Sequence, residues 1–175
     1  KQTGAELAAA GMRRVLLVYG QGSIRRNGVY ADVTGSLAGA GIAWTEWPGV
    51  SPNPLLSHVR EGIALARQAR VDGVLAVGGG SVIDAAKAIA LGVPAAEEVW
   101  SFYMGEAAPQ TALPLATVLT LPATGSEMNG GTVITHDGTR EKRAVIHPLL
   151  HPKVSLLDPE TTLTVPPDYV AYSAS

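Results

Sequence analysis

Apolar residues in this chain form short runs, separated by segments in which apolar positions recur every three or four residues. The runs have the length of buried strands and lie at residues 15–19, 42–47, 74–77 and 115–119. Helical spacing is found at residues 29–40, 53–66 and 81–90. Shorter runs predict further strands at residues 132–135, 144–146 and 154–157, whereas the stretch from 92 to 114 shows no regular period.

This alternation of strands and helices predicts an α/β fold, namely a Rossmann-like parallel sheet with right-handed crossovers and helices on both faces. In such sheets a ligand binds where the strands end, at their carboxyl edge. Two of the predicted strand ends, after residues 19 and 77, are rich in glycine. We therefore expect the functional site at this edge.

Composition excludes several classes of function. Hydrophobic residues make up 46% of the chain and charged residues only 16%, which argues against disorder. The formal net charge is −2 and no basic run exceeds two residues, so neither a nucleic-acid surface nor an anionic membrane surface is expected. No apolar run is long enough to span a bilayer. The absence of cysteine excludes disulfides and thiolate metal sites and fits a cytoplasmic protein.

The strongest local motif is GGGSVID at residues 78–84. Gly79 and Gly80 would let the main chain approach a bulky anion, and the following helix would direct its free N–H groups toward that anion. Ser81 could cap this helix, with Asp84 close to capping-box spacing. A tight turn with a good cap is the alternative, but such a turn does not need three glycines. The motif therefore favours a phosphate-binding loop.

The loop after the first strand carries a weaker signal. Gly20 and Gly22 match the first two glycines of a dinucleotide fingerprint, but Arg25 stands where the third would be, so a plain turn remains an alternative. The loop has no carboxylate for a ribose 2′-hydroxyl, and its hydroxyl and guanidinium groups would suit a 2′-phosphate; they belong to Ser23, Arg25 and Arg26. This favours NADP(H) over NAD(H). Glu46, at the end of the second strand, is the residue that would argue for NAD(H).

Two further groups of polar residues are candidate ligands. Thr120, Thr124 and Asn129 follow the fourth strand and could hold a carboxamide or pyrophosphate, although taken alone this segment favours a polar loop in which Ser126 caps a short helix. His147 and His151 have the spacing of a helical zinc-binding pair. Each precedes a proline, however, and such residues are disfavoured in helices, so no metal ligand is assigned in this chain.

Taken together, these segments resemble the iron-containing (group III, metal-dependent) alcohol dehydrogenases, in the branch of NADPH-dependent butanol dehydrogenases and aldehyde reductases. The matching motifs occur in family order over nearly the whole chain: YGQGS at 19–23, NGVY at 27–30, PNP at 52–54, GGGSVID at 78–84, LPATGSE at 121–127, Lys142, and LDP at 157–159. Gln21 departs from the glycine common at its place in the family. The resemblance implies the cofactor-binding part of a dehydroquinate synthase-like fold, over residues 1–160.

The resemblance also implies individual roles. Gly22 and Ser23 would lie near the adenosine ribose, and Asn53 would hold the adenosine end of the cofactor. The pyrophosphate would lie against Gly79, Gly80 and Ser81, with Asp84 toward the nicotinamide. Thr120, Thr124 and Asn129 would line the nicotinamide pocket. Lys142 would reach the nicotinamide ribose, and Leu157 would close the floor. The substrate would be a small alcohol or aldehyde, and the protein a homodimer.

In this family one Asp and three His residues hold Fe²⁺ or Zn²⁺ in a second, all-helical domain. Residues 161–175 look like the start of that domain, and the chain stops near the expected first ligand. We therefore expect the metal only in a full-length protein, assign no catalytic residue here, and expect this chain alone to be inactive. The alternative function is a free-standing dinucleotide-binding module without chemistry.

Overall fold

A computed structural model describes residues 2–163 of the chain. Its centre is a five-stranded sheet in which every pairing is parallel, in the order β2-β1-β3-β4-β7. The strands are β1 (Arg14–Tyr19), β2 (Ala43–Trp47), β3 (Gly73–Gly79), β4 (Leu115–Leu121) and β7 (Val154–Leu157). The predicted Rossmann-like parallel sheet is thereby confirmed.

Side chains of the central strands are buried alternately on the two faces of the sheet, which explains their nearly continuous apolar sequences. Along β1, Leu16 and Val18 belong to one hydrophobic core, while Val15 and Leu17 belong to the other. Successive side chains of a strand point to opposite faces, so a strand covered on both sides must be apolar throughout. The sheet therefore separates two cores.

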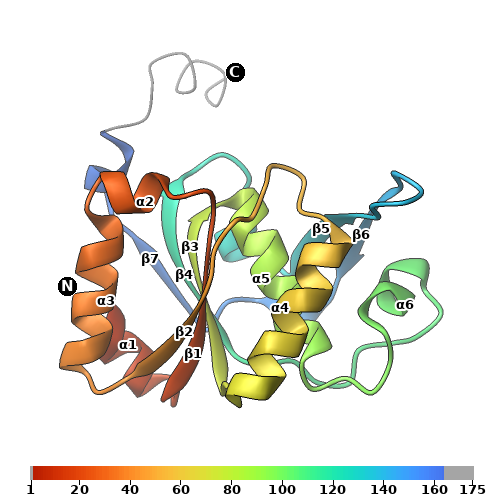
Figure 1. The fold of residues 1–175 in the computed structure, drawn as a ribbon, viewed down its shortest axis with the longest axis horizontal. Coiled ribbons are helices and arrows are strands. Elements are labelled where there is room, and N and C mark those ends of the chain that lie inside the picture. The colour runs from red at the N-terminus through yellow and green to blue at the C-terminus, as the bar shows by residue number, and fades with distance from the viewer. Residues whose placement is uncertain (1, 164–175) are drawn as a thin grey trace.

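One face of the sheet is covered by α1 (Thr3–Ala9) and α3 (Val29–Gly39), with the short α2 (Ser23–Arg26) near the end of β1 (Figure 1). The helix α3 buries Val29, Val33 and Leu37, as the helical spacing predicts. The helices α1 and α3 pack so closely that the main-chain oxygen of Ser36 lies where a Cβ atom on Gly4 would be.

The other face carries α4 (Leu56–Ala69) and α5 (Gly80–Gly92). Beyond them lie α6 (Val99–Met104) and a two-stranded antiparallel hairpin of β5 (Gly131–Thr135) and β6 (Lys142–Ile146), on the right of Figure 1. Three short 3₁₀ helices complete the described chain: η1 (Ser126–Met128), η2 (Pro148–Leu150) and η3 (Pro159–Thr162). The buried helix α5 lies between the sheet and the hairpin.

Hydrophobic spacing did not predict α1, α2 or α6. Each has at most seven residues and buries only one to three of them, so no apolar period can be recognised. Two details of the predicted helix starts are wrong. The helix α4 begins at Leu56 and not at residue 53. Ser81 does not cap α5: the N-cap is Gly79, and no side chain caps this helix. The expected helical start at residues 161–175 lies mostly outside the described residues.

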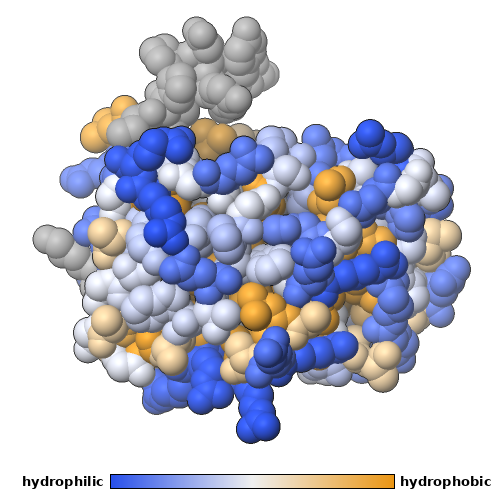
Figure 2. Space-filling model, in the orientation of Figure 1, coloured by the Kyte–Doolittle hydropathy of each residue, from blue (hydrophilic) through white to orange (hydrophobic). Residues whose placement is uncertain are grey.

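The surface agrees with a chain that buries its apolar residues in two cores. On the face shown in Figure 2, hydrophilic side chains predominate and apolar ones form separate patches. Within residues 2–163, no helix has the length and hydropathy needed to cross a membrane.

Candidate functional site

A cavity of about 410 Å³ lies beyond the carboxyl ends of β3 and β4. Its lining comes from several separate segments: the loop before α4, the first turns of α5, the loop after β4, and the hairpin. Half of the residues expected to bind a dinucleotide line it, namely Asn53, Gly80, Ser81, Asp84, Thr124, Asn129 and Lys142. The cavity is therefore the candidate site.

The floor of the cavity requires glycine. At Gly80, the first residue of α5, an added Cβ atom would collide with the side chain of Thr124. Because no side chain caps α5, the main-chain N–H groups of its first turn are open to an anion at the positive end of a 13-residue helix. This is the geometry expected of a phosphate-binding turn.

Asn53 and Lys142, which are far apart in the sequence, meet at the rim of the cavity. The Lys142 ammonium donates a hydrogen bond to the Asn53 side-chain oxygen at 2.7 Å. Asn53 has a left-handed φ of 55°, a conformation that asparagine tolerates better than most residues. The pair places one positive charge beside the mouth of the cavity.

Asp84 supplies the negative charge of the cavity wall. Its carboxylate accepts hydrogen bonds from the Ser126 hydroxyl at 2.9 Å and from the main-chain N–H of Val133. Burial raises the pKa of Asp84, although these hydrogen bonds and two nearby lysines oppose the shift. Asp84 is thus fixed in place, and the surrounding charges are mainly positive.

One lysine that sequence reasoning missed lies directly behind this wall. Lys87 in α5 is 0% exposed, and its ammonium donates to the main-chain oxygens of Ser126, Asn129 and Gly131 at 2.7, 2.7 and 2.8 Å. The sequence did carry a signal, because Lys87 is the one charged residue within the apolar stretch 85–92 of a helix. A charge inside such a helix must find buried partners.

The residues expected to bind the adenosine end are arranged around a different strand end. Gly20, Gly22, Ser23 and Arg25 follow β1 and do not line the cavity. Gly22 has a φ of 105°, so this turn depends on glycine. The Ser23 hydroxyl is in an exposed residue at the start of α2.

Arg25 is not free to bind a phosphate, because it is paired with Glu46 at 2.5 Å. The Arg25 guanidinium also lies over the Tyr30 ring, 3.9 Å from its centre. The Glu46 carboxylate accepts further hydrogen bonds from the hydroxyls of Tyr19, at 2.6 Å, and Tyr30. Both of its oxygens are therefore engaged within the protein, and Glu46 has a structural role.

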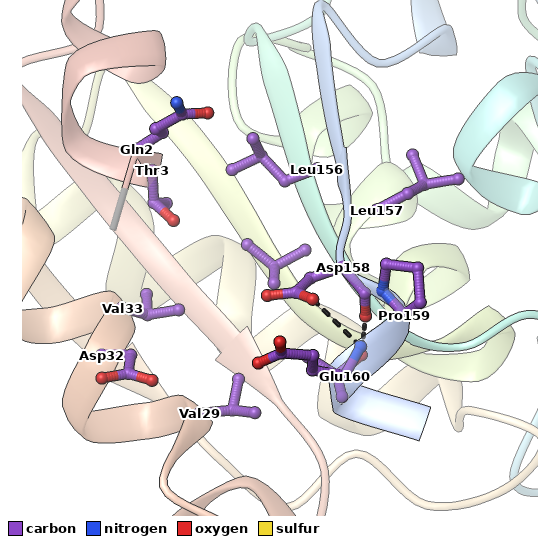
Figure 3. Close-up of a pocket in the computed structure, with 12 residues that line it drawn as sticks. Gln2, Thr3, Val29, Asp32, Val33, Leu156, Leu157, Asp158, Pro159 and Glu160 are labelled. Atoms are coloured by element: carbon purple, nitrogen blue, oxygen red, sulfur yellow. Dashed lines mark hydrogen bonds between the residues drawn. The ribbon is translucent and has the colours of Figure 1, made fainter. Parts of the chain in front are cut away.

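Two predicted residues lie apart from the cavity. Thr120 is near the end of β4, where the pairing with β3 is irregular, but it does not line the space. Leu157, the last residue of β7, lines a larger cavity of about 560 Å³ on the other face of the sheet. Figure 3 shows this second cavity between α3 and the chain after β7, with the carboxylates of Asp32, Asp158 and Glu160 around it. Such an acidic rim is unfavourable for an anionic dinucleotide.

The two histidines with helical spacing do not form a helical pair. His147 and His151 both have extended backbones on either side of the 3₁₀ helix η2, as the following prolines predict. In the part of the chain that the structure describes, no three His, Asp or Glu side chains converge as a metal site. The expected metal therefore does not fit the residues between 2 and 163.

The chain is similar in sequence to a known family of proteins. The sequence pattern of the family described as "Iron-containing alcohol dehydrogenase" matches residues 1–159. The chain is 51% identical over 160 residues to a probable NADH-dependent butanol dehydrogenase 2 of Bacillus subtilis, covering 91% of this chain and 41% of that protein. It is 38% identical over 174 residues to the NADPH-dependent aldehyde reductase YqhD of Escherichia coli, covering 94% and 44%.

Among solved structures, the NADH-dependent butanol dehydrogenase A of Thermotoga maritima superposes with a TM-score of 0.96 at 47% identity. This match covers 99% of the chain and 44% of the other protein. The chain thus spans less than half the length of these relatives. By motif, sequence and fold, the chain belongs to the iron-containing alcohol dehydrogenase family.

Proposed function

We propose that this chain is the cofactor-binding part of an oxidoreductase that interconverts alcohols and aldehydes with a nicotinamide dinucleotide. The observation that carries this proposal is the convergence of Asn53, Gly80, Asp84, Asn129 and Lys142 on one cavity at the carboxyl edge of the sheet. The family membership and the names of the relatives support it. When bound, the dinucleotide supplies the hydride that reduces an aldehyde, or accepts it from an alcohol.

The residues of this chain would bind and orient the dinucleotide. The main chain at Gly79 and Gly80, with the first turn of α5, would bind the pyrophosphate, because no side chain caps the N–H groups of that turn. Lys142 would add a positive charge and would reach the nicotinamide ribose. Thr124 and Asn129 would line the nicotinamide side.

We propose a preference for NADP(H) over NAD(H), resting on Ser23 and Arg26. Arg26 is exposed and has no ion pair or side-chain hydrogen bond within residues 2–163, so it is available to a 2′-phosphate. Arg25 supports the preference less than its sequence position indicates, because Glu46 holds it. The relatives named above include both NADH-dependent and NADPH-dependent enzymes.

The metal, the substrate contacts and the homodimer are proposals for a longer protein. No metal site fits residues 2–163, so we derive no step through a metal and propose that this chain alone does not turn over substrate. We also retain the proposal of a cytoplasmic enzyme. The substrate class would be small alcohols and aldehydes.

The proposal is tested by titrating the 175-residue chain with NADPH and NADH, with cofactor fluorescence as the signal. Saturable binding that Lys142→Met weakens would support it. The matched control is Lys153→Met, since Lys153 is exposed and lies away from the cavity lining. If neither dinucleotide binds, the proposed cofactor role of the chain is wrong.

A further inference from the structure

Lys87 is the only charged side chain that is buried among residues 2–163, and the proposed function does not use it directly. It does not line the cavity. It lies in α5, whose other residues from Val82 to Gly92 are, apart from Asp84, apolar and buried. A lysine here must have its charge compensated, because burial of an unpaired ammonium is costly.

The partners of Lys87 all belong to one short segment, residues 126–131. Its three N–H groups match three main-chain oxygens, those of Ser126, Asn129 and Gly131, at 2.7 to 2.8 Å. The side-chain oxygens of Ser126 and Asn129 are also within 3.1 and 3.2 Å of the ammonium. The segment therefore bends around a single ammonium group.

The same segment forms one wall of the cavity. Ser126, Asn129 and Gly131 line it, and the Asn129 side chain in addition bonds to the main chain of Gly125 and Gly131. This wall contains little regular structure: a three-residue 3₁₀ helix is followed by a turn into β5. Without an internal ladder of hydrogen bonds, such a segment depends on side chains to fix its main-chain groups.

Asp84 lines the cavity and is joined to the Lys87 ammonium through the Ser126 hydroxyl. Its carboxylate accepts a hydrogen bond from the Ser126 hydroxyl, while the main-chain oxygen of Asp84 accepts one from the hydroxyl of Thr132. Thr132 in turn contacts the buried Tyr103 hydroxyl at 3.0 Å. The wall is thereby joined to α5 and α6 by a continuous set of hydrogen bonds centred on Lys87.

We propose that Lys87 is a positioning residue for cofactor binding, which holds residues 126–131 in the conformation that receives the nicotinamide half of the dinucleotide. This inference rests on the proposed function. It assigns Lys87 no contact with the cofactor, because the side chain lies behind the wall. Its effect reaches the ligand through Asn129 and Gly131.

The test compares the wild-type chain, Lys87→Met and Lys87→Gln in their binding of NADPH and of ADP, which lacks the nicotinamide half. Lys87→Met removes every donor and should weaken NADPH binding by roughly tenfold, with ADP binding kept within roughly twofold. General loosening of the fold would instead weaken both ligands alike. Lys153→Met, on an exposed lysine, should change neither.

A second variant and a second measurement address the case in which Lys87→Met does not fold. If Lys87→Met does not fold, Lys87→Gln, which retains two N–H donors, should fold and show a smaller loss of NADPH binding. Amide hydrogen exchange should accelerate at residues 126–131 in either folded variant, relative to β1 and β3. Equal loss of NADPH and ADP, or no loss of either, would overturn the positioning role. Failure of the wild-type chain to bind any dinucleotide would instead contradict the proposed function.

Discussion

The side chain of Thr124 occupies the space that a Cβ atom on Gly80 would need. Gly80 begins α5 on one side of the cavity, and Thr124 belongs to the loop after β4 on the other. Because the two elements are in contact at this point, glycine at position 80 is required by packing and not by its backbone angle. Any side chain would push the loop away from the start of the helix.

Gly80→Ala should therefore weaken binding of both dinucleotides by roughly tenfold, because the methyl group displaces Thr124 and the pyrophosphate turn together. The measurement is a fluorescence titration. Gly35→Ala is the matched control, since no atom lies within 4 Å of a Cβ at this position in α3. It should leave binding unchanged and stabilise the chain by about 0.5–1 kcal/mol, as glycine is a poor helix former. Unchanged binding in Gly80→Ala would show that the turn does not hold the cofactor.

Ser23→Asp should reverse the proposed cofactor preference. A carboxylate at the start of α2 would repel a 2′-phosphate but could accept a hydrogen bond from a 2′-hydroxyl. We expect NADPH binding to weaken by roughly tenfold while NADH binding is kept or improved. Parallel titrations measure both. Arg70→Gln, on an exposed arginine after α4, is the charge control. If the wild-type chain already prefers NADH, the proposal of NADP(H) is wrong.

The cluster around Glu46 should make stability depend on acidic pH. Burial opposes the ionisation of Glu46, but the hydroxyls of Tyr19 and Tyr30 and the Arg25 guanidinium outweigh it and lower its pKa. A carboxylate with a lowered pKa stabilises the fold above its ordinary value of 4.5, and this contribution is lost as the pH falls below that value.

Urea unfolding of the wild type and of Glu46→Gln should therefore differ at neutral pH and converge in acid. The difference should be about 1 kcal/mol or less, because Arg25 and Glu46 are both partly exposed to solvent. A difference that grows as the pH falls would contradict the structural role given to Glu46.

Lys87 should produce a second pH dependence, at alkaline pH, in which stability again rises with pH. Burial lowers its pKa from 10.5 to about 8, while the charges of Asp84 and Glu127 partly oppose this shift. Between these values the unfolded chain keeps the proton that the folded chain has lost, so the fold gains stability as the pH rises. The gain is at most about 3 kcal/mol.

The quantity to measure is the free energy of unfolding of the wild type minus that of Lys87→Met, at about pH 7 and about pH 10. Subtraction removes the other titrating groups, and the difference should rise with pH. A difference that stays constant or falls would show that the ammonium is not desolvated as described.

The sequence predicted the parts of this molecule that depend on regular periods. The apolar runs of β1, β3 and β4 were recognisable because nearly all of their side chains are buried. The stripe of α3 was recognisable because Val29, Val33 and Leu37 recur at helical spacing and are buried. The motif at residues 78–84 likewise predicted the turn before α5, since glycines at the end of a buried strand have few other uses.

What escaped prediction depends on contacts between distant residues. Arg25 looked available for a phosphate because the ion pair with Glu46 joins α2 to β2, which are separate in sequence. Lys87 was overlooked for the same reason, as its partners lie about forty residues further along the chain. Local pattern shows which side chains could act, but tertiary contacts decide which of them are already engaged.

All five strands of the sheet run in the same direction, so every loop of the candidate site leaves from one edge. The opposite edge carries the turns that enter the strands, including those at Gly41 and Asp72, which do not line the cavity. A cysteine introduced at the exposed Ala43, which begins β2 at that edge, would therefore carry a fluorescent label or an affinity tag without blocking the cavity.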